Sequence, residues 1–462
     1  MTQPTNVNQI CKNLHHPRQA GRFAARSLGA WTAVAGLALG LVLSSPAQVL
    51  QQWSHQAAIG EASAAVAMGG NYMFVADNED EVLRLYDRVP TNACAAPAYA
   101  FDARPYLTPA TSSPEADLEA AVKVTDARGT RIYWLGSHSN SKTGKPRPDR
   151  NRFFATQVSG TGAGAAPYSL SFVGRYDGLR TDLIAWDQNN LHGKGANYFG
   201  LAASAYAASS GGVAPTRIDG FNIEGLVMAP DGVTAYIAFR APLVNGSGPT
   251  TSLDQRTNAL LVPLLNMPAL VTGSPTAGPG VARFGAPITL PLGARGVRSI
   301  DSSYPGHYLI TAGPTADVTY PPVAPNNFCL FTWTGNPADA PVERMTEFPY
   351  GMDPEGAIIS PGPITSNTVV QFVCDDSGGC WRSFIACAGP VMTPVLNIAP
   401  SGGNVIVSWP ASAAGYRLQH CADLVQKNWV DCTTAPASYG VGKLAVVEPA
   451  DGIRFYRLIK TL

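Results

Sequence analysis

Three glutamates stand at the start of apolar segments in similar surroundings, and carboxylates in such a pattern could hold a cation. The segments are "DLEAAV" with Glu119, "NIEGLV" with Glu224 and "DPEGAI" with Glu355. Carboxylates that meet at one opening repel one another, and Ca²⁺, which takes about six to eight oxygen ligands, would relieve that repulsion. We therefore expect Glu119, Glu224 and Glu355 to be the metal ligands of a calcium site, with Asp301 and Asp353 nearby.

A structural role is the alternative for these glutamates. A glutamate at the start of a buried strand can accept hydrogen bonds from the backbone of a neighbouring sheet and so hold two sheets together. Arg240 and Arg298 follow or open strands at equivalent positions of the repeat. We expect these two arginines to form ion pairs with the glutamates.

A basic loop is the second group of residues that could do chemistry. Its sequence is "GSHSNSKTGKPRPDRNR", residues 136–152. Guanidinium groups bind phosphate, sulfate and carboxylate through paired hydrogen bonds, so Arg150 could face an anionic ligand. His138 could act as a general acid or base. We assign His138 and Arg150 as candidate catalytic residues, and the alternative is that the loop is a solvated basic surface.

These residues need a scaffold that brings distant segments together, and repeated strand patterns predict one. Each glutamate is followed by an apolar strand, a turn containing Gly, Pro or Asp, and a second apolar strand. Repeated small sheets of this kind are typical of a β-propeller, whose units pack around a central channel. The sequence predicts an all-β fold with a propeller over residues 55–390; six blades are expected, with five or seven as alternatives. The interval 181–209 is predicted to hold a helical insert that could conceal a further blade.

The propeller prediction also explains why a glutamate can begin an otherwise buried strand. The first strand of each blade lines the channel, so a glutamate there would face the polar channel mouth while its neighbours are buried. The small residue that follows each glutamate would let the inner strands approach closely around the axis. The glutamates are therefore predicted to form a ring.

Composition agrees with a turn-rich β protein and excludes a nucleic-acid-binding class. Charged residues make up 14% of the 462, against about 25% in average globular domains, while Gly 46 and Pro 38 are both high. The basic and acidic residues balance at 32 each, without the strongly basic character typical of nucleic-acid binding.

The N-terminus is predicted to be a signal peptide, residues 1–47. Basic residues precede the apolar run "LGAWTAVAGLALGLVL", and "SSPAQ" supplies small residues for cleavage. The run is shorter than the roughly 20 residues that span a membrane. We expect a secreted or periplasmic protein, and an uncleaved N-terminal membrane anchor is the alternative.

The cysteines fit an exported protein, because disulfides persist in oxidising compartments. Seven cysteines follow the predicted signal peptide. We expect one disulfide between Cys374 and Cys380 and another between Cys421 and Cys432. The spacings are not those of a zinc ribbon, so metal binding by thiolates is the weaker interpretation.

Residues 60–390 resemble a bacterial domain family of unknown function. The resemblance lies in "IYWLGSHSNSKTGKPRPDRNRFFAT", "NIEGLVMAPDGVTAYIAFRAPLVNGS" and "DPEGAI". That family is similar to phytase-like, "esterase-like" propellers, in which bound calcium neutralises and orients a phosphate. The resemblance therefore implies calcium as a cofactor and an anionic substrate.

Residues 393–462 resemble a fibronectin-type-III-like β-sandwich, joined to the propeller by the linker "AGPVMTP". Such modules serve adhesion, spacing or sorting. Its two tryptophans, Trp409 and Trp429, are expected in the sandwich core rather than as platforms for sugar stacking.

Two functions remain open at the level of sequence. The first is an exported, calcium-dependent hydrolase of a phosphorylated or otherwise anionic substrate. The second is a non-catalytic binding or scaffold module of the cell envelope or secretome, with a small anionic or polymeric extracellular ligand. The sequence does not decide whether the protein is an enzyme.

Overall fold

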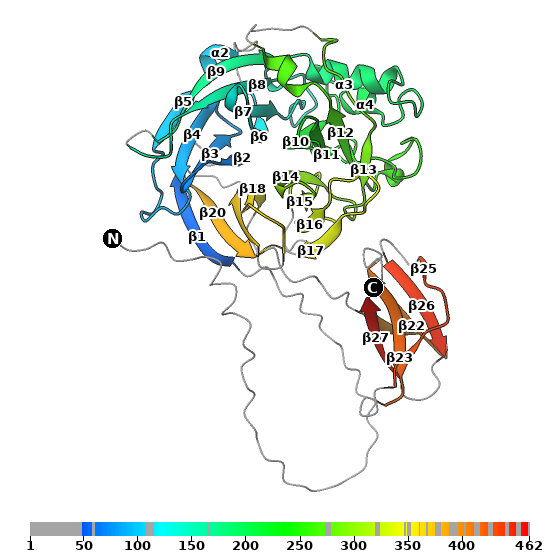
Figure 1. The fold of residues 1–462 in the computed structure, drawn as a ribbon. Coiled ribbons are helices and arrows are strands. Elements are labelled where there is room, and N and C mark those ends of the chain that lie inside the picture. The colour runs from blue at the N-terminus through cyan, green and yellow to red at the C-terminus, as the bar shows by residue number, and fades with distance from the viewer. Residues whose placement is uncertain are drawn as a thin grey trace.

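The described residues fold mainly into short antiparallel sheets, five of which surround a common axis (Figure 1). The computed structural model describes residues 49–57, 61–107, 115–164, 167–272, 279–318, 324–345, 348, 353–359, 361–365, 368–374, 380–387, 396–401, 403–410, 416–423, 428–438, 443–449 and 454–460. The predicted signal peptide, residues 1–47, lies outside the described residues. The prediction of an all-β propeller is confirmed.

Each blade of the propeller is a four-stranded sheet. In order from the inner to the outer strand, blade 1 has β2 (Ala62–Ala67), β3 (Tyr72–Asp77), β4 (Val82–Asp87) and β5 (Tyr99–Asp102); blade 2 has β6 (Leu118–Asp126), β7 (Gly129–Gly136), β8 (Phe153–Ser159) and β9 (Ser169–Tyr176); blade 3 has β10 (Asn222–Met228), β11 (Ala235–Ala241), β12 (Ala259–Leu264) and β13 (Ile288–Leu290); blade 4 has β14 (Gly296–Tyr304), β15 (His307–Gly313), β16 (Cys329–Trp333) and β17 (Val342–Met345); blade 5 has β18 (Pro354–Ile359), β19 (Val369–Cys374), β20 (Cys380–Cys387) and β1 (Val49–Gln56).

The described residues form five blades rather than the expected six. The inner strands contact one another in the cyclic order β2, β6, β10, β14, β18 and back to β2, so five sheets close the ring. The interval that could have concealed a blade contains the helices α3 (Leu179–Gln188) and α4 (Leu201–Ser204) instead. α3 buries Leu183 and Trp186 against the core between blades 2 and 3, which explains its apolar residues.

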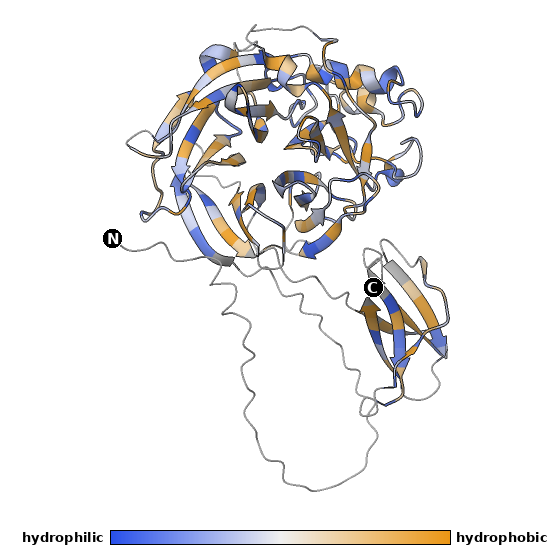
Figure 2. Cartoon of the chain, viewed as in Figure 1, coloured by the Kyte–Doolittle hydropathy of each residue, from blue (hydrophilic) through white to orange (hydrophobic). Residues whose placement is uncertain are grey.

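The N-terminal strand closes the ring. β1 pairs antiparallel with β20 and becomes the outer strand of blade 5, so the two ends of the propeller segment share one sheet. Figure 2 shows that β1 is mainly hydrophilic, as expected of a strand at the rim. A disulfide between Cys94, in the loop after β4, and Cys380 ties blade 1 to the same sheet. The predicted Cys374–Cys380 disulfide is wrong, because Cys380 is bonded to Cys94.

Small residues allow the inner strands to approach closely, as predicted. A Cβ atom on Gly225 would lie 2.7 Å from Cβ of Ala238 and 2.9 Å from Ile300 Cγ2. A Cβ on Gly356 would lie 2.6 Å from Val373 Cγ2. The glycine after Glu224 and Glu355 is therefore required by packing.

The other helical segments among the described residues are short and lie in loops. They are α2 (Arg104–Leu107), η1 (Pro148–Arg150), η2 (Leu253–Gln255) and η3 (Met267–Val271).

The C-terminal segment forms two further sheets, a β-sandwich. One sheet has the order β21 (Asn397–Ser401), β22 (Asn404–Pro410), β26 (Lys443–Pro449) and β25 (Ala437–Ser438); the other has β24 (Val430–Asp431), β23 (Tyr416–Cys421) and β27 (Phe455–Lys460).

The core of the sandwich corrects two sequence predictions. Trp409 is 1% exposed and lies in this core, as predicted. Trp429 lies outside it, half-buried, with the guanidinium of Arg457 4.3 Å from the ring centroid. The predicted Cys421–Cys432 disulfide is wrong, because both residues are free thiols. The backbone N–H of Cys432 bonds to the carbonyl oxygen of Leu418. Successive side chains of a strand point to opposite faces of the sheet, so Cys421, three residues after Leu418, points to the other face.

Candidate functional site

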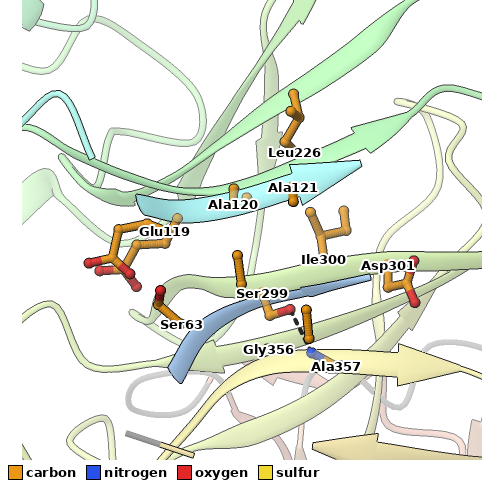
Figure 3. A pocket seen from close by; sticks show the side chains of 14 residues that line it. Ser63, Glu119, Ala120, Ala121, Leu226, Ser299, Ile300, Asp301, Gly356 and Ala357 are labelled. Atoms are coloured by element: carbon orange, nitrogen blue, oxygen red, sulfur yellow. Dashed lines mark hydrogen bonds between the residues drawn. The ribbon is translucent and has the colours of Figure 1, made fainter. Parts of the chain in front are cut away.

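The inner strands of all five blades line a narrow cavity on the propeller axis (Figure 3). Its volume is about 20 Å³, which is room for about one water molecule. Glu119, Glu224 and Asp301 are its acidic lining residues, and most of the other lining residues are small. Figure 3 places Glu119 and Asp301 toward opposite ends of the lining.

Glu224 is buried between two arginines at the end of the channel where the inner strands begin. Arg240 Nη1 lies 3.0 Å from Glu224 Oε1, and Arg298 Nε lies 3.1 Å from Glu224 Oε2. Asn222 Nδ2 donates a further hydrogen bond to Oε1 over 2.8 Å. Only 2% of Glu224 is exposed, so these groups rather than water surround its charge; among the described residues, Oε2 lies near Arg298 but accepts no hydrogen bond.

Arg298 also holds Glu355, which joins blades 4 and 5 to the same network. Its Nε donates to Glu355 Oε2 over 2.9 Å, and its Nη2 contacts Oε1. Both side chains are buried. The predicted ion pairs of Arg240 and Arg298 with the channel glutamates are therefore confirmed.

Glu119 lines the same cavity without a guanidinium partner of its own. Among the described side chains, none lies within ion-pair distance of it. Burial raises the pKa of Glu119 well above its usual value, and the nearby charges of Glu224 and Asp117 raise it further. Glu119 therefore takes up a proton more readily than an ordinary glutamate.

Asp301 occupies the opposite end of the lining. Its carboxylate accepts hydrogen bonds from the backbone N–H groups of Ser302 over 2.8 Å and Ile359 over 3.2 Å. Burial nevertheless raises the pKa of Asp301 to about 6, because these bonds and the more distant Lys123 and Arg88 only partly offset the loss of solvation.

The three predicted metal ligands thus converge, but the donor set fits ion pairs better than calcium. Both oxygens of Glu224 and both of Glu355 face guanidinium groups. A calcium ion would need about six to eight oxygen ligands, and two positive groups already occupy the space beside four of the available oxygens. Calcium binding at Glu119, Glu224 and Glu355 remains a prediction.

The candidate catalytic residue His138 lies inside the basic loop, with no exposed surface. Its backbone has a φ of 55°, a left-handed conformation that is uncommon for residues other than glycine. Burial lowers the pKa of His138 to about 3, and the positive charge of Arg180 lowers it further. The imidazole is therefore neutral at physiological pH.

Arg150, the second candidate, is the centre of a buried network in the same loop. Its Nη1 lies 2.8 Å from Asp117 Oδ2 and 2.7 Å from Ser139 Oγ, and its Nη2 contacts Glu115 Oε1. Only 11% of its side chain is exposed. The structure therefore brings His138 and Arg150 into one loop but turns both toward protein groups.

The helical insert holds this loop in place. Asn140 Nδ2 donates hydrogen bonds to the carbonyl oxygens of Tyr206 and Val213, both over 2.9 Å. Arg180 Nη2 donates to Asn140 Oδ1 over 2.8 Å. The basic loop is thus rigidly placed, and its exposed basic side chains are Lys142 and Lys145.

The basic loop and the insert lie on the same face of the propeller. Because neighbouring strands are antiparallel, the start of each inner strand and the end of the next strand lie on one face. We call this the loop face. It carries residues 78–81, 103–107, 115–117, 137–152, 177–221 and 242–258.

A cavity of about 300 Å³ opens between loops of blades 1 and 2 on the loop face. Pro105, Leu107 and Ala116 form apolar parts of its wall. Its charged lining residues are Glu81, Arg104, Glu115, Asp149 and Arg152.

Among these charged groups, Glu81 stands out. Its Oε1 accepts a hydrogen bond from the backbone N–H of Ala116 over 2.7 Å, and burial raises its pKa. The sequence prediction missed this cavity, because loop residues have no periodicity that would reveal it; the acidic run "NEDE" before β4 was the available signal.

Comparisons with known proteins support no assignment of family or activity. No family model and no curated protein match the sequence. One similar solved structure is regucalcin, a calcium-binding protein from Agrobacterium tumefaciens, at 10% identity and a TM-score of 0.29, covering 73% of this chain and 97% of that chain. Another is the PQQ-bound aldose sugar dehydrogenase from Streptomyces coelicolor, at 11% identity and a TM-score of 0.34, covering 74% and 97%.

A third similar structure is the extracellular domain of a candidate one-component system from B. thetaiotaomicron, at 7% identity and a TM-score of 0.25. The match covers 87% of this chain but only 44% of that chain. These values are too low to support an argument about activity or ligand. The resemblances to phytase-like propellers and to fibronectin type III modules remain predictions.

The described residues include no helix that is both long enough and apolar enough to cross a membrane.

Proposed function

We propose that the protein is an exported, non-catalytic binding module whose loop face recognises an extracellular polymer. The observation that carries the proposal is the cavity of about 300 Å³ between the loops of blades 1 and 2. It is at the lower end of the size range of small-ligand sites, with apolar walls and a few polar groups, one of them with a perturbed pKa. The axial cavity of about 20 Å³ has no room for such a ligand.

The lining favours an uncharged ligand with hydroxyl groups, such as the sugar units of a neutral polysaccharide. Two guanidinium groups line the cavity, those of Arg104 and Arg152, and each already contacts a carboxylate, so neither is free to hold a phosphate or sulfate. Arg152 already contacts Asp149 over 3.2 Å. Hydroxyl groups could donate to Glu81, whereas Pro105 and Leu107 would contact the apolar face of a sugar ring.

Export is part of the proposal. The Cys94–Cys380 disulfide agrees with an oxidising compartment, and the sequence of residues 1–47 has the features of a signal peptide. A rigid loop face suits a binding role, because ligand binding then orders few side chains.

A binding assay tests the proposal. The full mature chain is titrated with a neutral polysaccharide, dextran, and with two anionic polymers, heparin and polyphosphate. We expect binding to dextran that falls at least about tenfold in Glu81→Gln, which keeps the shape of the side chain but removes its charge. Asp126→Asn is the matched control, since Asp126 is an exposed carboxylate on the opposite face. Binding to the anionic polymers alone, or equal binding by both variants, would overturn the proposal.

A calcium-dependent hydrolase is the second candidate, and Glu119 is the observation that favours it. Its carboxylate lines the axial cavity beside Glu224 and is not held by an arginine. Turnover of phosphorylated substrates is measured with and without a chelator. Calcium-dependent turnover that disappears in Glu119→Gln would support this candidate. Glu119→Gln disturbs the fold less than Glu224→Gln would, because Glu224 forms ion pairs with Arg240 and Arg298.

A further inference from the structure

A cluster of three metal-ligating side chains lies in the β-sandwich, away from the propeller sites. The residues are His420 on β23, Cys432 just after β24, and Glu448 on β26. Their ligand atoms all lie within 4.8 Å of one another. β26 belongs to one sheet of the sandwich and β23 to the other, so the cluster bridges the two sheets.

The separations between the atoms match a tetrahedral metal site. Cys432 Sγ lies 3.4 Å from His420 Nδ1, and His420 Nδ1 lies 3.8 Å from Glu448 Oε2. With Zn–S bonds of about 2.3 Å and Zn–N bonds of about 2.0 Å, neighbouring ligands of a tetrahedral zinc ion lie about 3.3–3.8 Å apart. Two of the three separations therefore fit a tetrahedral ion, and the third, between the ligand atoms of Cys432 and Glu448, lies within 4.8 Å.

The surroundings of the cluster include one competing positive group. Glu448 is 5% exposed, and Arg454 Nη1 lies 3.1 Å from its Oε2, so a metal ion would share this carboxylate with a guanidinium. The hydroxyl of Tyr456 is buried beside the cluster, and its ring packs edge-on against His420 with centroids 6.4 Å apart.

We propose that His420, Cys432 and Glu448 bind one Zn²⁺ ion and that this ion holds the two sheets of the sandwich together. A thiolate, an imidazole and a carboxylate form a ligand set that suits zinc better than the hard cations Ca²⁺ and Mg²⁺. The thiol of Cys432 loses its proton to solvent when the ion binds. A water molecule completes the fourth position.

Metal binding is measured on the full mature chain, with the Cys94–Cys380 disulfide intact. Zinc stoichiometry is determined after dialysis against zinc alone, and Co²⁺ is used as a spectroscopic probe. We expect one zinc ion per chain and a thiolate-to-cobalt charge-transfer band. Cys432→Ser should abolish the band and weaken zinc binding by more than about tenfold, whereas Cys421→Ser, at the other free cysteine of the sandwich, should change neither.

A second readout separates ligation from folding. Zinc should raise the unfolding temperature of the native chain, and a chelator should reverse the rise, while Cys432→Ser should keep its circular dichroism spectrum and show no response to zinc. The absence of the cobalt band in the native chain would show a thiol–imidazole hydrogen bond only and would overturn the proposal. Equal loss of the band in both cysteine variants would also overturn it.

Discussion

The two ends of the propeller channel satisfy buried carboxylates in different ways. At the loop face, Glu224 and Glu355 lie against Arg240 and Arg298, so charge is compensated by charge. At the opposite end, Asp301 has only backbone N–H donors close by, and its pKa rises to about 6. A ring of carboxylates in a channel is therefore not by itself a metal site, since arginines or protons can also neutralise it.

Removing Arg298, which bridges Glu224 and Glu355, should have the largest effect on stability. This variant tests the ion-pair network at the loop-face end of the channel. Arg298→Met leaves Glu224 and Glu355 buried with one guanidinium fewer, and we expect the free energy of unfolding to fall by about 3–5 kcal/mol. The measurement is urea denaturation at pH 7. Adding Glu355→Gln to this variant should recover part of the loss, because one uncompensated charge is removed.

Arg217→Met is the matched control for this variant. Arg217 also forms an ion pair, with Asp219, but 55% of its side chain is exposed. We expect no measurable change, since an exposed pair gains little over its hydrated state. Equal stability of the two variants would show that the channel network does not hold the blades together.

At the opposite end of the channel, the charge of Asp301 should lower the stability of the folded protein rather than raise it. Because the pKa of Asp301 is raised in the folded state, the native protein binds more protons than the unfolded chain between about pH 4 and pH 6, and stability falls as pH rises through that window. Asp301→Asn removes the titrating group, but its single carbonyl oxygen can accept only one of the two backbone hydrogen bonds, which reach different carboxylate oxygens. We therefore expect the stability of the variant relative to the native chain to be about 1–3 kcal/mol more favourable at pH 7 than at pH 4.

Unfolding curves at pH 4 and pH 7 check this prediction. If the stability of the variant relative to the native chain does not improve from pH 4 to pH 7, the charge of Asp301 is needed, by Lys123 or Arg88, and the two ends of the channel are alike. The comparison of the two pH values is its own control, because a merely structural loss would appear at both.

The channel could be predicted from sequence, because its residues belong to a repeat. The glutamate followed by a small residue marks the start of an inner strand, and the same repeat placed Arg240 and Arg298 beside the glutamates. The blade count could not be predicted, because the apolar residues of α3 fit a buried strand as well as a helix that packs on the core. Strand β1 is too polar to be recognised and is defined only by pairing with β20.

Contacts between loops, and between segments far apart along the chain, could not be predicted from the sequence either. Cys94 and Cys380 are separated by 286 residues and meet because the ring closes. Cys374 and Cys380 lie on the adjacent strands β19 and β20 but are not opposite each other in their register. The cavity around Glu81 is made by connections from two blades. Neither feature has a local signal, since each depends on which segments the fold brings side by side.

Added calcium should have the smallest effect on stability. The test shows whether Glu119, the third carboxylate of the ring, is neutralised by a proton or by a metal ion. Its raised pKa means that a cation must compete with a proton more strongly than at an ordinary glutamate, so an alkaline condition such as pH 8 favours calcium. We expect millimolar CaCl₂ at pH 8 to leave the unfolding temperature unchanged, because Arg240 and Arg298 already neutralise the neighbouring glutamates. MgCl₂ at the same ionic strength is the control. A calcium-specific rise that disappears in Glu119→Gln would reverse this conclusion and place an ion, rather than a proton, on the third carboxylate of the ring.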